Sequence, residues 1–480
     1  METATQTYHR LTSYVPGLEW DKPLDDPRLL KDLETNVIEK LPWFYKRYPQ
    51  SLPTIALPRQ LRPTTAPALA VMGGVADIEP SAADLPQLAR LLHLSGGVTR
   101  TAERPYATWL FRAAGSAGGR FPLELYLAIP EGLPGPAGVH WYDPYEHALV
   151  TIGPAPEGEA ATVVVTGVPW RTGWRYRERG FRHIYWDAGT MLAQLLAVAS
   201  SGGLAPQLYS RFPDAQVASL VGADGVHEWP VAVISLGDGT PSLLPTGDAA
   251  VGAVDNEPIE FPLVTMAQHA GDHDSLGRPW SAGDPVKVDP DIAATAPVET
   301  VVLSRGTQRL MDRSRGLPEP LLRTSMQLAM RGIGVPHRVV VHDVGGLAPG
   351  IYRWPDLSAP AVPGELRDEL YRIALDQGLA ADAAFVVIAA ADIGTLDDHE
   401  WREVHLAAGI VEGRLHLAAY ALDASASGMT FLDSEIPALL GEQLQGVLFT
   451  CVGVPEYKSA VGGAPGEPTQ IRMVTPRVGD

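Results

Sequence analysis

A stretch of small residues, Gly115-Ser-Ala-Gly-Gly119, carries the pattern best suited to holding a ligand. Glycine has no Cβ, so a backbone built from such residues can approach a flat or anionic molecule closely. Beyond Pro122 the chain alternates through Leu123, Leu125, Leu127 and Ile129, which predicts a buried strand. We interpret the stretch as a ligand-binding turn that leads into a strand, with an ordinary small-residue loop as the alternative.

The charge of the chain restricts its partners. Lysine and arginine number 37 against 56 aspartate and glutamate residues, a formal net charge of −19. A surface this negative opposes nucleic acid and anionic membranes, so an anionic ligand requires a local basic pocket. The first residues do not resemble a secretory signal, and no apolar run approaches the ~20 residues that a membrane span needs. We therefore expect a cytoplasmic protein without nucleic-acid or membrane partners.

Other chemical motifs are weak. Cys451 is the single cysteine, which excludes an internal disulfide framework and a cysteine-rich metal site. His269, Asp272, His273 and Asp274 have a spacing that could hold a metal, but no regular element presents them, so we interpret them as a solvated loop and predict no metal. The chain contains neither a phosphate-binding Walker loop nor the glycine fingerprint of a Rossmann domain.

The elements that must position these residues form more than one domain, because 480 residues exceed the length of one ordinary core. Residues 1–68 are rich in proline and aromatics and predict an extended segment that wraps a domain surface. Leucine spacing predicts a helix over 82–94, and Asp187 is placed to cap a second helix that runs to residue 199. Residues 241–297 lack periodicity and predict an interdomain linker.

An internal repeat organises the rest of the chain. Asp187-Ala-Gly189 and Ala407-Ala-Gly409 each lie on a predicted helix, and each helix is followed by Phe-x-Asp and then by a β-branched run. Gly189 and Gly409 are 220 residues apart, whereas the two phenylalanines, Phe212 and Phe431, are 219 apart. This order predicts two copies of one α+β unit, over 69–240 and 298–480, packed as a pseudo-dimer in one chain, for which a monomer is the expected state.

Four segments together resemble the nitroreductase-like flavoproteins, in particular the SagB-type dehydrogenase branch that includes cyanobactin thiazoline oxidases. They are Tyr8-His-Arg-Leu-Thr-Ser13, the stretch from Gly115 to Tyr126, the run from Trp174 to Gly189, and Arg305-Gly-Thr-Gln-Arg309. The resemblance implies a mixed or antiparallel sheet packed with helices in each repeat. It also implies FMN bound between the two units, with a basic motif on the phosphate and a small-residue turn against the ring.

In this chain the two halves of such a site are divided between the repeats. The second repeat has the basic motif, whereas the first has no basic residue at the matching place, 72–76. We therefore expect one FMN per chain and a degenerate second site. The expected cofactor-binding residues are Arg305, Thr307, Arg309, Gly115, Ser116, Ala117, Gly118, Gly428, Met429, Thr430 and Lys458, and Arg472 is an alternative to Lys458.

In the SagB-type oxidases a Lys-Tyr pair before the Asp-Ala-Gly helix is assigned acid and base work, and the matching positions here are Arg175 and Tyr176. An arginine stays protonated and cannot act as a base, although it can bind an anionic substrate. The resemblance implies an FMN-dependent dehydrogenase that oxidises a peptide or other natural product, with dioxygen as the electron acceptor. The alternatives are NAD(P)H-dependent reduction of nitro or quinone compounds, and flavin binding without turnover.

Overall fold

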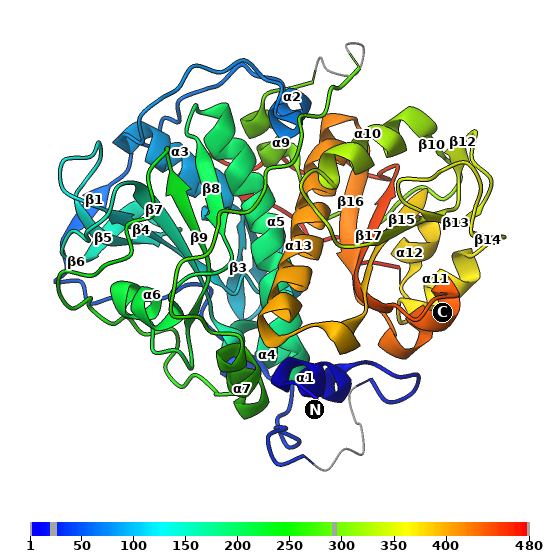
Figure 1. Ribbon diagram of the computed structural model, residues 1–480, viewed down its shortest axis with the longest axis horizontal. Helices are drawn as coiled ribbons and strands as arrows, with labels where there is room; N and C mark the ends of the chain where they lie inside the picture. The colour runs from blue at the N-terminus through cyan, green and yellow to red at the C-terminus, as the bar shows by residue number, and fades with distance from the viewer. Residues whose placement is uncertain (1, 20–25, 290–294, 478–480) are drawn as a thin grey trace.

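The computed structural model describes residues 2–19, 26–289 and 295–477, and it places two sheet-containing halves on either side of a central pair of long helices (Figure 1). The helices of the pair are α5 (Gly180–Ser201) and α13 (Asp398–Ala421), one from each half. The two halves therefore meet through helices, and each sheet lies on the outer side of its own helix (Figure 1).

The sheet of the first half has seven strands in the order β1-β6-β5-β4-β7-β9-β8. All neighbouring strands run antiparallel. Every residue of the central strands β4 and β7 is buried, as expected for strands covered on both faces. The strands are β1 (Thr54–Ala56), β4 (Leu123–Ile129), β5 (Gly138–Asp143), β6 (Ala148–Gly153), β7 (Ala161–Gly167), β8 (Pro206–Tyr209) and β9 (Trp229–Leu236).

The sheet of the second half repeats this arrangement with six strands in the order β14-β13-β11-β15-β17-β16. Its strands are also antiparallel throughout. They are β11 (His337–Val341), β13 (Gly350–Arg353), β14 (Val362–Pro363), β15 (Phe385–Ala391), β16 (Ser425–Met429) and β17 (Gln445–Gly453). The matching strand order confirms the predicted tandem α+β fold.

Helices also occur in matching pairs. The short helix α2 (Ala68–Gly73) corresponds to α9 (Val298–Ser304), and the residues before them, Pro67 and Pro297, form a β-bridge with each other. Similarly, α3 (Leu85–Gly96) corresponds to α10 (Glu319–Ala329), and α6 (Asp214–Val221) to α14 (Ile436–Leu440). The remaining helices are α1 (Ala4–Thr12), α4 (Pro169–Tyr176), α7 (Pro262–Ala270), α11 (Arg367–Ile373) and α12 (Gly378–Asp382).

Glycines allow α5 and α13 to pack with their backbones in contact. A Cβ on Gly189 would lie 2.5 Å from the backbone nitrogen of Ile410, and one on Gly413 would lie 2.7 Å from the carbonyl oxygen of Thr190. A Cβ on Gly409 would likewise overlap the backbone of Trp186. Real Cβ atoms do not approach other atoms this closely, so the helix pair requires glycine at these positions.

Two ion pairs cross between the halves in a reciprocal manner. Arg182 on α5 contacts Asp433 of the second half at 2.6 Å, and Arg402 on α13 contacts Asp214 of the first half at 3.5 Å. Both aspartates belong to the repeated Phe-x-Asp motif. Burial raises the pKa of Asp433, but Arg179 and Arg182 more than offset this effect and hold it below its ordinary value.

Three expectations about local structure were wrong. The segment 1–68 is not extended throughout, because Thr3 and Gln6 form a capping box that starts α1. The segment 241–297 contains the helix α7. The long first-half helix begins at Gly180 rather than at Asp187, which lies inside it. The helix predicted over 82–94, in contrast, is present as α3, which Asp84 caps by accepting a hydrogen bond from the backbone of Gln87.

We predict that Gly189→Ala lowers the thermal midpoint and the free energy of unfolding. Its added Cβ overlaps backbone atoms that cannot rotate away, and overpacking costs about 1–3 kcal/mol or more. Gly334→Ala is the matched control, because a Cβ there meets nothing within 4 Å. Equal melting curves for the two variants would show that α5 and α13 separate at little cost.

Candidate functional site

Two adjoining cavities lie where the first half meets the second. The larger, which we call the cationic cavity, has a volume of about 400 Å³, and the smaller, the inner cavity, has about 140 Å³. Both are lined by Gly115, Ser116, Thr307 and Arg309. The small-residue turn and the basic motif therefore meet, although nearly 190 residues separate them in the sequence.

The small-residue turn connects β3 (Ala107–Arg112) to β4 and is fastened to α5. Ser116 donates through Oγ to Asp187 (2.5 Å), and the backbone nitrogen of Ala117 donates to the same carboxyl group (3.0 Å). The Ser116 hydroxyl also accepts from the backbone nitrogen of Phe121 at 2.7 Å. Because these bonds engage the hydroxyl, the turn presents mainly backbone and small side chains to the cavities.

Gly118 and Gly119 give the turn its shape. Both have positive φ values, 59° and 64°, which favour glycine. A Cβ on Gly118 would also lie 2.6 Å from Cδ of Arg175 and 2.8 Å from the hydroxyl of Tyr176. The predicted pair therefore covers this turn directly. Tyr176 lines the inner cavity, whereas Arg175 is exposed and is not one of its walls.

The basic motif follows the end of α9. Arg305 is buried; its Nη2 donates to the carbonyl oxygen of Ala113 at 2.5 Å, and its Nη1 lies 3.4 Å from Nδ1 of His416. Its Nε has no hydrogen-bond partner among the described residues. A buried guanidinium with an unused donor is a strong site for an anion.

Positive charge is concentrated around the larger cavity. Among the residues that the structure describes, six basic ones line it and no aspartate or glutamate does: Arg100, Arg112, Arg305, Arg309, Lys458 and Arg472. Burial and the nearby charge of Arg305 lower the pKa of Arg100 to about 10. In a chain with a net charge of −19, such a group is unusual and favours an anionic ligand.

The last part of the chain completes this cavity. Strand β18 (Thr469–Gln470) pairs in parallel with β2 (Val98–Arg104), which forms a hairpin with β3. This pairing brings Arg472 from the second half against the hairpin of the first half. The second repeat has no hairpin at the corresponding place, because α10 is followed within a few residues by β11.

The inner cavity is bounded by α5, α13 and β16. Residues 427–430 form one wall, as predicted, and Glu412 and His416 of α13 form another. A Cβ on Gly428 would lie 2.9 Å from Cδ of Glu412, so glycine allows that carboxyl group to approach the strand. Burial raises the pKa of Tyr176, which keeps its hydroxyl protonated.

All predicted site residues except Arg175 line one or both cavities: Tyr176, Arg305, Thr307, Arg309, Gly115, Ser116, Ala117, Gly118, Gly428, Met429, Thr430 and Lys458. The prediction missed Arg100, His183, Asp187, Glu412 and His416. The four-residue spacing of Glu412 and His416 on one helix face was the available signal for that pair. Nothing in the sequence around Arg100 indicated its place.

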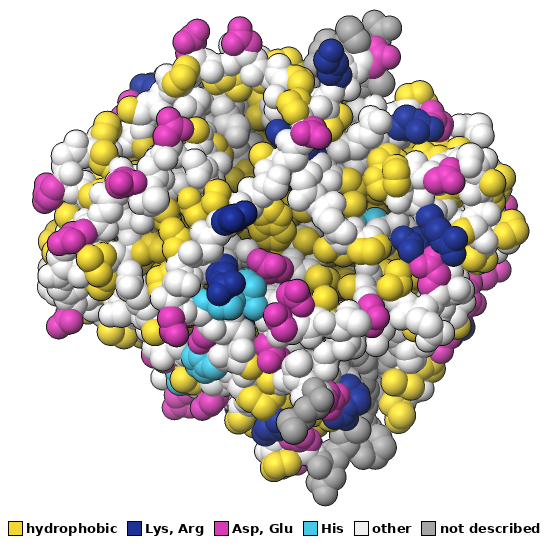
Figure 2. All heavy atoms as spheres, in the orientation of Figure 1, with side chains coloured by type: hydrophobic (Ala, Val, Ile, Leu, Met, Phe, Trp, Pro, Cys, Tyr) yellow, Lys and Arg dark blue, Asp and Glu magenta, His cyan; other side chains and the backbone are white. Residues whose placement is uncertain are grey.

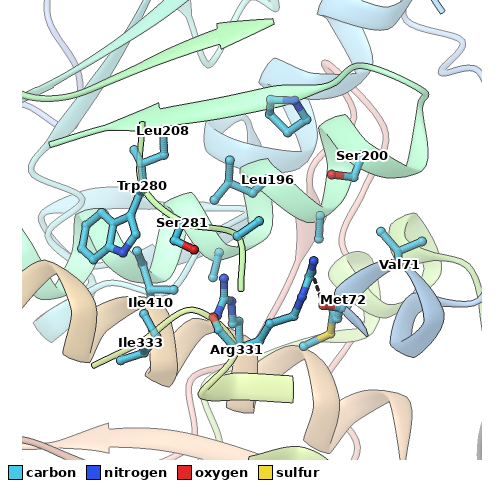
Figure 3. Close-up of a pocket in the computed structure, with 15 residues that line it drawn as sticks. Val71, Met72, Leu196, Ser200, Leu208, Trp280, Ser281, Arg331, Ile333 and Ile410 are labelled. Atoms are coloured by element: carbon cyan, nitrogen blue, oxygen red, sulfur yellow. Dashed lines mark hydrogen bonds between the residues drawn. The ribbon is translucent and has the colours of Figure 1, made fainter. Parts of the chain in front are cut away.

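The pseudo-symmetric counterpart of this site is a smaller cavity, lined mainly by apolar side chains together with Arg331 and Arg414 (Figure 3). Val75 is the first-half counterpart of Arg305, because each lies eight residues after its matching proline, Pro67 or Pro297. Leu196 is likewise the counterpart of His416, seven residues after Gly189 and Gly409 respectively. A cavity of about 120 Å³ remains, lined by residues that include Met72, Leu208 and Ile410.

The predicted linker occupies this counterpart. The backbone nitrogen of Trp280 donates to the carbonyl oxygen of Leu208 at 2.6 Å, and that of Val286 donates to Gly73 at 2.9 Å. Arg331 points toward Met72, whose carbonyl oxygen accepts from its Nη1 at 3.2 Å (Figure 3). The guanidinium of Arg331, which lines the counterpart cavity, is therefore hydrogen-bonded to the protein backbone.

The loop considered as a metal site is held by ion pairs. His269 contacts Asp272 at 2.7 Å, and Asp272 contacts Arg402 at 2.8 Å. In the part of the chain that the structure describes, no group of three or more His, Cys, Asp and Glu side chains is arranged to hold a metal ion. Likewise, no helix within the described ranges has the length and apolar character needed to cross a membrane.

On the face shown in Figure 2, hydrophobic side chains gather toward the middle, and lysine and arginine side chains stand in separate small groups.

Comparisons with known proteins agree with this architecture. A solved structure of a provisionally named nitroreductase from Anabaena variabilis is 22% identical; the match covers 95% of this chain and 100% of that chain, with a TM-score of 0.71. The provisionally named nitroreductase MJ1384 of Methanocaldococcus jannaschii is 26% identical over 168 residues, 32% of this chain and 80% of that protein. No family model matches the chain. The chain therefore has a nitroreductase-like fold over nearly its whole length.

We predict that Asp187→Asn stabilises the protein increasingly as pH rises. Burial raises the pKa of Asp187 to about 8 in the folded state, from an ordinary value of 3.8. Between these values the unfolded chain loses the proton while the folded chain keeps it, so wild-type stability falls as pH increases, by a few kcal/mol in total. Asparagine does not titrate.

The measurement is urea unfolding of flavin-free protein at pH 5 and pH 9. Asp238→Asn, at an exposed turn, is the control. A difference between wild type and Asp187→Asn that is the same at both pH values would contradict the assignment.

Proposed function

We propose that this protein is an FMN-dependent oxidoreductase that transfers a hydride between a substrate and N5 of the flavin. The observation that carries the proposal is the cationic cavity: six basic side chains without an acidic one, next to a turn of small residues. A flavin nucleotide has the complementary form, a flat ring joined to a phosphate. When bound, FMN supplies two-electron chemistry that protein side chains lack.

The residues present fit this cofactor. Arg305 offers its unpartnered Nε, Thr307 a hydroxyl and Lys458 an ammonium group, which suit a phosphate. Arg309 lines both cavities, so it suits the ring edge where negative charge develops. Gly115 and Gly118 line the cavities without side chains of their own, and residues 427–430 form another wall of the inner cavity.

We further propose one FMN per chain. Val75 and Leu196 replace the cation and the histidine of the functional site, and the linker around Trp280 lies in the corresponding space. Arg331 cannot serve a phosphate there without losing its bonds to the carbonyl oxygens of Met72 and Gly283.

Within this class, we propose a SagB-type dehydrogenase that oxidises a peptide or other natural product, with dioxygen as the acceptor. Support comes from Tyr176, which lies beside the turn, at the position of the tyrosine in the Lys-Tyr pair of the SagB-type oxidases. The second candidate is NAD(P)H-dependent reduction of nitro or quinone compounds, which the names of the two similar proteins favour. Both candidates use the same cavities.

Purified protein should carry close to one flavin per polypeptide. Bleaching of the yellow protein by NAD(P)H under anaerobic conditions supports the reductase; a bound flavin that ignores NAD(P)H but is reduced by a peptide substrate supports the dehydrogenase. Protein that takes up no added FMN would rule out every version, and two flavins per chain would rule out the single-site proposal.

We predict that Arg305→Ala weakens FMN binding roughly 10- to 100-fold, since a hydrogen bond to a charged group contributes about 1.5–3 kcal/mol. Flavin fluorescence titration of the flavin-free protein measures the change. Arg331→Ala, at the counterpart site, should leave the affinity unchanged. A comparable loss in both variants would mean that the counterpart also holds cofactor.

A further inference from the structure

Four groups that line the inner cavity can in principle accept a proton: His183, Asp187, Glu412 and His416. Three of them are engaged by the protein. Asp187 accepts from Ser116 and Ala117, and Glu412 accepts from Thr190 at 3.4 Å and lies 3.5 Å from Nε2 of His416. Nδ1 of His416 faces the guanidinium of Arg305.

His183 differs from the other three. Only 4% of its surface is exposed, yet neither ring nitrogen has a hydrogen-bond partner among the described residues. Its ring stacks on Tyr176, with centroids 4.2 Å apart and planes at 19°, and it meets the edge of Trp186 at 4.7 Å. A buried polar ring left without a partner is costly unless a ligand supplies one.

The surroundings of His183 keep it neutral. Burial lowers its pKa well below the ordinary value, and Arg179, Arg182 and Arg175 act in the same direction. The carboxyl group of Asp187 lies one turn further along α5. Glu412 and His416 of α13 and Arg309 line the same cavity, and His405 of α13 stacks on Trp186 at 6.0 Å. A neutral imidazole has one nitrogen free to accept a proton.

The predicted catalytic pair, Arg175 and Tyr176, cannot accept the proton that oxidation of a substrate releases. Arg175 is permanently charged, and the hydroxyl of Tyr176 keeps its own proton because burial raises its pKa. Oxidation of a substrate releases a proton as well as a hydride, so the cavity requires an acceptor.

We propose that His183 is the proton acceptor of this site, taking up the second proton of each two-electron reaction. The inference rests on the proposed FMN function. The substrate loses a hydride from carbon to the flavin, which receives both electrons, and a proton from the adjacent nitrogen, oxygen or carbon to a ring nitrogen of His183. The negative charge that accompanies the electrons stabilises the imidazolium. In the reverse direction His183 returns the proton to the product.

The pH dependence of the FMN midpoint potential tests this role without turnover. For a two-electron couple each coupled proton shifts the potential by about 30 mV per pH unit. We expect the potential of the FMN-loaded wild type to fall by about 60 mV per pH unit below neutrality. One proton goes to N5 of the flavin, whose other ring edge stays anionic beside Arg309, and one goes to His183. In His183→Gln the fall should be about 30 mV per pH unit.

His405→Gln is the matched control, because His405 is also buried and neutral, with its pKa lowered to about 3, but does not line the cavity. It should behave as wild type. A pH indicator in weakly buffered solution gives a second readout: on reduction, wild type should take up about one more proton per flavin than His183→Gln.

Equal slopes in wild type and His183→Gln would overturn the role of His183, and so would a wild-type slope of about 30 mV per pH unit between pH 5 and 7. The wild-type slope tests the proposal on its own, so it remains decisive if His183→Gln does not fold. Wild-type protein that binds no FMN would instead refute the proposed function.

Discussion

The contact between the backbones of α5 and α13 determines the arrangement of the rest of the molecule. Gly189, Gly409 and Gly413 remove the side chains that would separate the two helices. The two halves are thereby fixed about a pseudo-twofold axis, and the ion pairs Arg182–Asp433 and Arg402–Asp214 repeat the same contact on opposite sides. The C-terminal half of each long helix thus lines a space between the two halves, and the pseudo-symmetry gives two such spaces.

What distinguishes the two spaces is local. One space receives the β2–β3 hairpin, the Gly115–Gly119 turn and the last strand of the chain, and it collects six basic residues. The other receives the linker and retains apolar walls. Asp187 illustrates the difference, since it holds the turn from α5, whereas the matching position on α13 is Ala407, where the second half has no such turn. The helices and sheets that the two halves share therefore determine where the two spaces lie, whereas the hairpin, the turn, the last strand and the linker determine which residues line them.

Much of this frame was predictable, because it depends on patterns that repeat along the chain. The apolar spacing on both long helices, the β-branched strands and the doubled Phe-x-Asp motif report interactions within one unit. Prediction from sequence neighbours failed where a side chain contacts a segment that is distant in the sequence. The sequence pattern predicts Asp187 as a helix cap. In the structure α5 starts seven residues earlier, and the carboxyl group of Asp187 binds the turn at Ala117, 70 residues away in the sequence. Arg100 and the linker at Trp280 likewise have their places only through contacts with distant segments.

The contrast between the two spaces has a physical explanation in these contacts. The helix contact and both crossing ion pairs do not depend on the chemistry of either space, because none of the residues that line the cationic cavity takes part in them. The space opposite the cationic cavity must still be largely filled, since buried voids and unpaired backbone groups are costly. Trp280 of the linker supplies apolar volume there, and Arg331 donates to the carbonyl oxygens of Met72, on α2, and of Gly283, in the linker. The same segment that joins the two halves therefore also lines the space opposite the cationic cavity.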